Sequence, residues 1–162
     1  MIAASWRSRI TLVTVLLLVL TGDLAFSQQP DDPLAGSTPE VLGSMTPGQG
    51  NGNALVFMRL TMEPGASIPA HHHPGAVVVV VQSGIFGTEF IEGEGTVARY
   101  GEQGTELLTA GHEITMGPGD SLSYEGAVHT MRNDGPGELV LLVSALLDPE
   151  QPGFIFMNAA QQ

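Results

Sequence analysis

The sequence predicts an all-β protein with a single folded domain. From Asn53 onward, short apolar segments alternate with turns rich in glycine and proline, a spacing typical of a β-sandwich or β-barrel. The clearest segment is Val77 to Val81, five consecutive β-branched residues that disfavour a helix and favour a strand. No later stretch keeps a helical period and no internal repeat is present, so we expect one barrel.

The first 27 residues resemble a secretory signal peptide. Arg7 and Arg9 form a positive start, residues 10–20 form an apolar run, and the small-residue pattern at 25–27 suits cleavage after Ser27. The run is shorter than the roughly 20 residues needed to span a bilayer. We therefore expect a secreted or periplasmic mature protein. The alternative is an uncleaved anchor, which would be the only contact with a membrane.

Residues 28–53 are rich in proline, glycine and polar side chains, which predicts a disordered or extended linker. Within it, residues 41–42 offer apolar side chains that could pack on the barrel or on a partner subunit. We predict the barrel over residues 54–148 and a C-terminal tail over 149–162. The adjacent apolar residues 154–156 of this tail are expected to dock on the barrel or on a neighbouring subunit.

Alternation and turn residues predict eight strands in the barrel. They cover residues 54–61, 76–82, 85–91, 96–100, 113–116, 121–124, 129–132 and 138–147. Glycine-rich turns such as 117–120 separate the later strands. Alternation also places Val77, Val79 and Val81 on one face, which we expect to point inward.

Charge and composition exclude several classes of function. Of the 17 acidic residues and five arginines, only Asp23, Arg7 and Arg9 lie in the leader, and the chain has no lysine. Such an acidic surface repels phosphate groups. This charge excludes nucleic acid as a partner and argues against docking on anionic lipid. The chain has no cysteine, so a metal would be bound by nitrogen and oxygen ligands.

Three adjacent histidines provide the candidate site. Alternate side chains of a strand share a face, so His71 and His73 point one way and His72 the other. His129, at the start of another predicted strand, is the natural third ligand, and neutral imidazoles suit divalent metal ions. We predict a metal site formed by His71, His73 and His129. A slip in register that brings in His72 is the alternative, and His112 lies in a glycine-flanked loop where a surface position is expected.

The spacing of these residues resembles the two motifs of the cupin superfamily. Gly65, His71, His73 and Gly84 match the first motif, and Gly119, Asp120, Gly126, His129 and Asn133 match the second. Tyr124 stands where the family usually has proline, one residue closer to Gly119 than usual. The resemblance spans about residues 54–147 and implies a double-stranded β-helix, that is, a jelly-roll cupin barrel.

The first motif departs from the family at one position. Val77 stands where the family has the glutamate that completes a set of three histidines and one carboxylate. Three-histidine sites are known in the superfamily, including thiol dioxygenases and some diketone-cleaving enzymes. Glu89 could supply the missing carboxylate from another strand, or it could face solvent. Arg59 could hold an acidic substrate, or it could point outward and cap a sheet edge. For both residues the outward orientation is favoured. Tyr124 and Met131 are candidate lining residues.

The resemblance implies three alternative functions. The first is a metal-dependent oxygenase or lyase for a small organic molecule such as an acid or thiol, with Fe, Mn, Zn, Ni or Cu as the ion. The second is a non-catalytic module that captures a small organic ligand, and the third is a metal-free structural barrel. We rank first a cupin that binds a metal ion, without specifying its activity. Cupins commonly form dimers, and the arm and the tail suit a homodimer.

Overall fold

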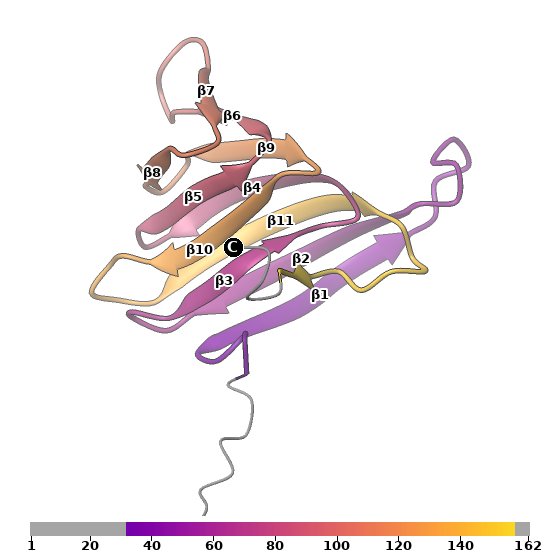
Figure 1. Ribbon diagram of the computed structural model, residues 1–162, viewed down its shortest axis with the longest axis horizontal. Coiled ribbons are helices and arrows are strands. Elements are labelled where there is room, and N and C mark those ends of the chain that lie inside the picture. The colour runs from indigo at the N-terminus through magenta and orange to yellow at the C-terminus, as the bar shows by residue number, and fades with distance from the viewer. Residues whose placement is uncertain (1–31, 158–162) are drawn as a thin grey trace, which may run out of the picture. The chain divides into compact units, whose positions relative to one another are not determined.

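A computed structural model describes residues 32–157, which form two antiparallel β-sheets (Figure 1). The predicted all-β class is confirmed, since these residues form strands and turns and no helix. Accordingly, within residues 32–157 no helix is long and apolar enough to cross a membrane. The signal peptide predicted for residues 1–27 lies outside the described residues.

The two sheets differ in size. The larger has seven strands in the order β1 (Ser37–Met45), β2 (Ala54–Met62), β11 (Leu139–Leu147), β4 (Gly75–Ser83), β9 (Ser121–Glu125), β6 (Glu94–Ala98) and β7 (Glu106–Thr109). The smaller has five, in the order β12 (Ile155–Phe156), β3 (Ser67–His72), β10 (Val128–Asn133), β5 (Phe86–Glu92) and β8 (Glu113–Met116). Strands that are distant in sequence, such as β2 and β11, are hydrogen-bonded neighbours, as in a jelly roll.

The core lies between the sheets and follows the predicted alternation. Val77, Val79 and Val81 of β4 are buried, whereas Val78 and Val80 are 45% and 36% exposed. Both sheets contribute to one core cluster, which includes Leu60, Met62, Leu122, Leu139 and Leu141 from the larger sheet and Ile68, Phe86, Phe90, Met116 and Met131 from the smaller. This arrangement makes the space between the sheets the interior of the barrel.

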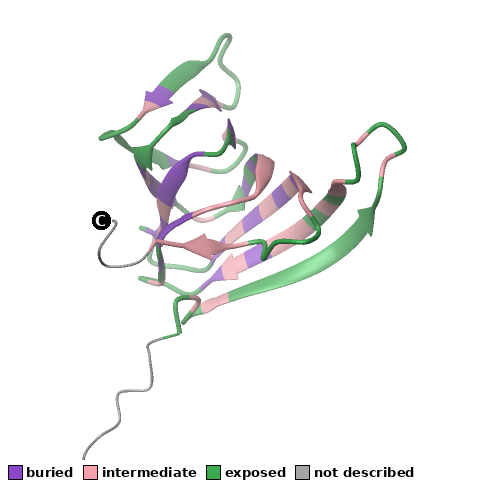
Figure 2. Ribbon diagram, turned by 45° about the vertical axis from the view of Figure 1, so that its right-hand side comes forward, coloured by how far each residue is buried: buried purple, intermediate pink, exposed green. Residues whose placement is uncertain are grey.

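Within the segment 28–53, predicted as a disordered or extended linker, the structure places an ordered strand. Ser37–Met45 form strand β1, which pairs with β2 from Ser37 opposite Met62 to Met45 opposite Leu55, with a shift in register between Val41 and Gly43. All its residues except Ser37 are exposed, so β1 is drawn almost entirely in green in Figure 2. An edge strand is held by backbone hydrogen bonds, which a composition poor in apolar side chains does not reveal.

The edge strand also settles the orientation of Arg59. This residue of β2 points away from the core, and its Nη1 lies 2.8 Å from Oε2 of Glu40 on β1. The outward alternative is therefore correct.

Three further strands, β3, β7 and β12, were not among the eight predicted. The four residues of strand β7, with two adjacent leucines, do not alternate between polar and apolar side chains, and β12 has only two residues. Strand β3 contains Pro69, and its pairing with β10 is irregular between His129 and Met131. Proline interrupts a strand pattern, so the sequence indicated strand alternation only at residues 71–73, and the full extent of β3 appears in its pairing with β10 and β12.

The apolar tail docks on the barrel, as predicted. In β12, Ile155 pairs with His72 and Phe156 pairs with His71 of β3. The tail thus joins the smaller sheet next to the histidine segment.

Candidate metal centre

Two neighbouring strands bring the three predicted histidines together. His71 lies on β3 and is directly opposite His129 on β10, and His73 follows the end of β3. One ring nitrogen from each residue can be chosen so that all three atoms lie within 4.8 Å of one another. His71 and His129 are fully buried, and His73 is half-buried. The cluster therefore lies inside the barrel.

The other two histidines lie elsewhere. His72 points to the opposite side of β3 and lines a surface hollow with Glu92 and Val128, and His112 is exposed in its loop. The predicted alternation is confirmed, and the alternative register that brings His72 into the cluster is not adopted.

Backbone carbonyls fix the tautomers of His71 and His73. Nδ1 of His71 lies 2.7 Å from the carbonyl oxygen of Pro69, and Nδ1 of His73 lies 2.6 Å from that of Gly153. A carbonyl oxygen only accepts hydrogen bonds, so each Nδ1 carries a proton and each Nε2 keeps a free lone pair. Nε2 of His71 is buried and has no hydrogen-bond partner among residues 32–157.

His129 is held by two hydroxyl groups. The Thr88 hydroxyl donates to the carbonyl oxygen of Thr130 at 2.7 Å, so its oxygen is left to accept a long, 3.5 Å contact from Nδ1 of His129. On the other side of the ring, the Tyr124 hydroxyl donates to Nε2 at 2.9 Å. The network thus assigns the unprotonated nitrogen of His129 to Nε2 as well.

Burial keeps all three imidazoles neutral near pH 7. Loss of hydration lowers the pKa of His71 to about 4, although the hydrogen bond to Pro69 opposes the shift. Burial likewise lowers the pKa of His73, and it lowers that of His129 well below 6.5, with further lowering by the neighbouring imidazoles. Burial also raises the pKa of Tyr124 far above its ordinary value. Neutral imidazole is the form that binds a metal ion.

The C-terminal tail covers the cluster. The Phe154 ring centroid lies 5.1 Å from that of His71 and 5.0 Å from that of His73. Phe154 is one wall of a cavity of about 20 Å³, whose other walls are Met58, Leu60, His73, Val77, Val79, Tyr124, Met131 and Val143. That volume is close to the space of one water molecule. The predicted lining residues Tyr124 and Met131 are confirmed.

The comparison with protein families agrees with the motifs. The sequence model of the Cupin domain matches residues 58–145, more than half of the chain. The chain belongs to the cupin family. A search of curated proteins found no matching relative of this cupin.

Solved structures with a similar fold include other cupins. The cupin 2 domain-containing protein from Halorhodospira halophila aligns with a TM-score of 0.50 and 17% identity, covering 82% of this chain and 78% of that one. An oxalate oxidase aligns at 0.43 with 20% identity over 93% and 72% of the two chains. An oxalate decarboxylase of Lactobacillus farciminis, solved as a formate complex, aligns at 0.44 with 15% identity over 64% and 26%. Of these three, only the Halorhodospira halophila structure reaches a TM-score of 0.50, and at 17% identity its likeness concerns the fold.

This cupin has no carboxylate in its histidine cluster. Val77 faces the interior and lines the cavity, as the motif spacing predicts. Among the histidines and carboxylates of the described residues, only the three histidines gather here as a group of potential ligands. Glu89 is half-buried on β5 opposite Glu113 of the edge strand β8 and does not join them. The alternative in which Glu89 supplies the missing carboxylate is therefore not adopted.

The positive side chains of the described residues are used outside the cluster. Arg59 pairs with Glu40, Arg99 pairs with Glu106 and Asp120, and Arg132 pairs with Glu113 and Asp134. None of these three arginines lines the cavity beside His73. A negatively charged ligand there would have to be bound by a metal ion rather than by an arginine.

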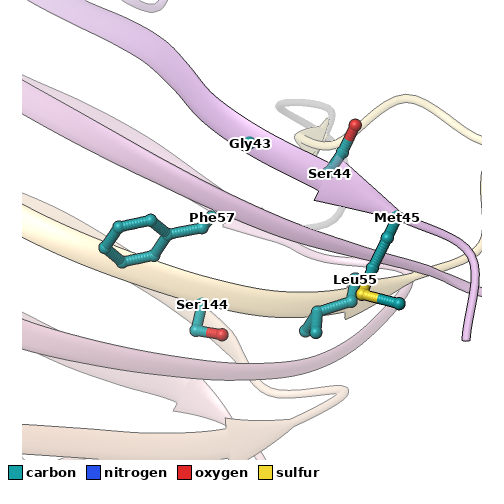
Figure 3. A pocket seen from close by; sticks show the side chains of 6 residues that line it. All are labelled: Gly43, Ser44, Met45, Leu55, Phe57 and Ser144. Atoms are coloured by element: carbon teal, nitrogen blue, oxygen red, sulfur yellow. The ribbon is translucent and has the colours of Figure 1, made fainter.

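A separate hollow lies on the outer face of the larger sheet. It has a volume of about 300 Å³ and is lined by Gly43, Ser44, Met45, Leu55, Phe57 and Ser144 (Figure 3). These residues offer apolar contacts and two hydroxyls but no titratable side chain. The histidine cluster is therefore the stronger candidate for chemistry.

Two parts of the cluster's surroundings were missed by sequence reasoning. The Gly153 carbonyl that orients His73 lies 80 residues away along the chain, and the Thr88 hydroxyl lies 41 residues from His129. Neither belongs to a motif, and their positions follow from strand pairing alone.

Proposed function

We propose that this cupin binds one divalent metal ion through the Nε2 atoms of His71, His73 and His129. The observation that carries the proposal is the set of tautomers: each Nδ1 has an oxygen acceptor, and each Nε2 is left with a lone pair. Metal-bound histidines are typically oriented by such hydrogen bonds from the second ring nitrogen. An unpartnered buried nitrogen such as Nε2 of His71 costs about 1–3 kcal/mol, and a bound ion would remove that cost.

The dimensions of the cluster suit an ion. Imidazole nitrogens bind such ions at about 2.0–2.1 Å, so two ligands of one ion lie at most about 4.2 Å apart. One ring nitrogen of each histidine lies within 4.8 Å of the other two, a spacing slightly wider than that of a bound ion's ligands. The donor set suits Fe, Zn, Ni or Cu, with Mn as a further candidate. When bound, the ion would supply a Lewis acid with open positions for water or substrate.

We propose that the reaction is an oxygenation or a lyase reaction on a small organic molecule. The small apolar cavity supports a small substrate, and Phe154 would have to move for it to enter. Because the three arginines are engaged elsewhere, the ion itself would bind an acidic group of the substrate. Non-catalytic capture of the same class of molecule is the second candidate. It is favoured by the absence of a carboxylate from the cluster within the described residues.

The leader supports export, which we propose as the route to the periplasm or the medium. N-terminal sequencing of the protein recovered from secreting cells tests this. We expect the mature chain to begin at Gln28, and a chain that keeps Met1 would contradict cleavage.

Metal content tests the proposed function most simply. We expect the purified protein, after incubation with each of the five candidate ions in turn and removal of the excess, to retain about one ion per chain for at least one of them. His73→Ala and His129→Ala should lose most of it. His72→Ala is the matched control and should retain the wild-type amount. Equal losses in all three variants, or no retained ion in the wild type, would contradict the site.

A substrate screen on the metal-loaded protein separates the two candidate activities. Consumption of oxygen or of a small organic acid or thiol would show an enzyme. Saturable binding without turnover would favour a capture module.

A further inference from the structure

We propose that Tyr124 is a fourth ligand of the metal centre and supplies, through its phenolic oxygen, the charged donor that Val77 lacks. The proposal rests on the metal site described above, and it assigns a role to a residue that the motif resemblance leaves without one.

The first argument is the place of Tyr124 in the sheet. Tyr124 on β9 pairs directly with Val77 on β4. Directly opposite residues of an antiparallel pair point to the same side of the sheet, so Tyr124 enters the interior beside the position of the missing carboxylate. The two residues line the same cavity with His73.

The second argument is the distance between Tyr124 and His129. The phenolic oxygen lies 2.9 Å from Nε2 of His129. Two ligands that each bind one ion at about 2.1 Å, at right angles to each other, lie about 3.0 Å apart. The tyrosine oxygen therefore already lies at the distance from Nε2 of His129 that a neighbouring ligand would have.

The third argument is that the ion and the hydroxyl need the same lone pair. In the structure, the Tyr124 hydroxyl bonds to Nε2 of His129, the nitrogen assigned to the ion. Tyr124 is only 7% exposed, and this is the one hydrogen bond of its hydroxyl among the described residues. Once the ion takes the lone pair, the hydroxyl loses this partner, and binding the ion would satisfy a buried oxygen that is unfavourable without one.

Packing holds the tyrosine ring in this orientation. The Phe90 ring meets that of Tyr124 edge to face, with centroids 5.6 Å apart. Gly95 pairs with Tyr124 across β6 and β9, and a Cβ atom at Gly95 would lie 2.8 Å from Cε2 of Phe90. The glycine thus leaves room for the Phe90 ring that supports Tyr124.

Binding through a phenolate changes the charge of the centre. As the oxygen–metal bond forms, the O–H bond breaks and the proton passes to solvent. Three imidazoles leave a divalent ion with its charge of +2, and one phenolate reduces it to +1. Tyr124 would thereby replace the charge of the family's glutamate with an oxygen from the neighbouring strand.

Cu²⁺ is a suitable probe because a copper–phenolate bond gives a visible charge-transfer absorption that imidazole ligands do not. The chain has only two tyrosines, and Tyr100 is 78% exposed. Tyr100→Phe is therefore a matched control for Tyr124→Phe. The experiment measures the Cu²⁺ affinity and the visible spectrum of the wild type and both variants.

We expect the wild type and Tyr100→Phe to show the charge-transfer band. Tyr124→Phe should still bind one ion but lose the band, with an affinity about 10- to 100-fold lower. If the wild type binds Cu²⁺ tightly without the band, the role of Tyr124 is refuted while the three-histidine site stands. If the wild type binds no Cu²⁺, the role of Tyr124 is refuted, and the metal site itself fails only if none of the five candidate ions is retained. The wild-type and Tyr100→Phe spectra decide the question even if Tyr124→Phe does not fold.

Discussion

Burial of His71 makes the metal-free protein sensitive to acid. Its pKa is about 4 in the folded protein and about 6.5 when the chain is unfolded. Between these values the unfolded chain takes up a proton that the folded protein does not, so the free energy of unfolding falls as the pH falls. At ~1.4 kcal/mol per pH unit, the loss attributable to His71 is about 3 kcal/mol. The loss begins near pH 6.5 and is complete near pH 4, and His73 and His129 add to it in the same direction.

Urea denaturation in the presence of a chelator measures this effect between pH 7 and pH 4. We expect His71→Leu to lose about 3 kcal/mol less than the wild type over this range, since leucine does not titrate. His72→Ala, outside the cluster, is the control and should follow the wild type. Parallel pH profiles for the wild type and His71→Leu would refute the argument that burial of this imidazole governs the acid sensitivity.

Three further substitutions test separate parts of the account. Val77→Glu should destabilise the metal-free protein because it buries a carboxylate. The same variant should bind a divalent ion at least about 10-fold more tightly in calorimetry. Val78 faces outward, so Val78→Glu is the control and should leave the affinity unchanged. Phe154→Ala should speed removal of the ion by a chelator several-fold in stopped-flow experiments, and an unchanged rate would mean that the tail does not shield the site. Asn133→Ala should lower the free energy of unfolding by about 2–3 kcal/mol in urea titrations, because Nδ2 donates to the buried carbonyl of Met62 at 3.0 Å and to that of Gly137 at 2.8 Å. A loss below about 0.5 kcal/mol would show that water replaces these bonds.

The parts of the fold visible in the sequence are those governed by side-chain alternation. Residues 77–81 predicted a central strand because five consecutive β-branched residues favour a strand over a helix. Their alternation correctly assigned the face that points inward. Strand β1 gave no such signal, because an edge strand with exposed side chains is held by its backbone. Its identification depends on pairing with β2, which is a long-range contact.

The residues of the candidate site also fall into those that the sequence indicated and those that only the structure reveals. The motif spacing identified His71, His73 and His129, and strand alternation separated His72 from them. The groups that orient these rings, such as the Gly153 carbonyl and the Tyr124 hydroxyl, come from other strands or from the tail. Their contacts depend on strand register and on where the C-terminal tail docks, neither of which local sequence specifies.

X-ray absorption spectroscopy of the metal-loaded protein tests the central claim most directly. It reports the number of imidazole ligands bound to the ion and their distances. We expect three imidazole nitrogens at about 2.0–2.1 Å, with the remaining positions filled by oxygen. A first coordination shell with one imidazole or none would contradict convergence of His71, His73 and His129 on a single ion.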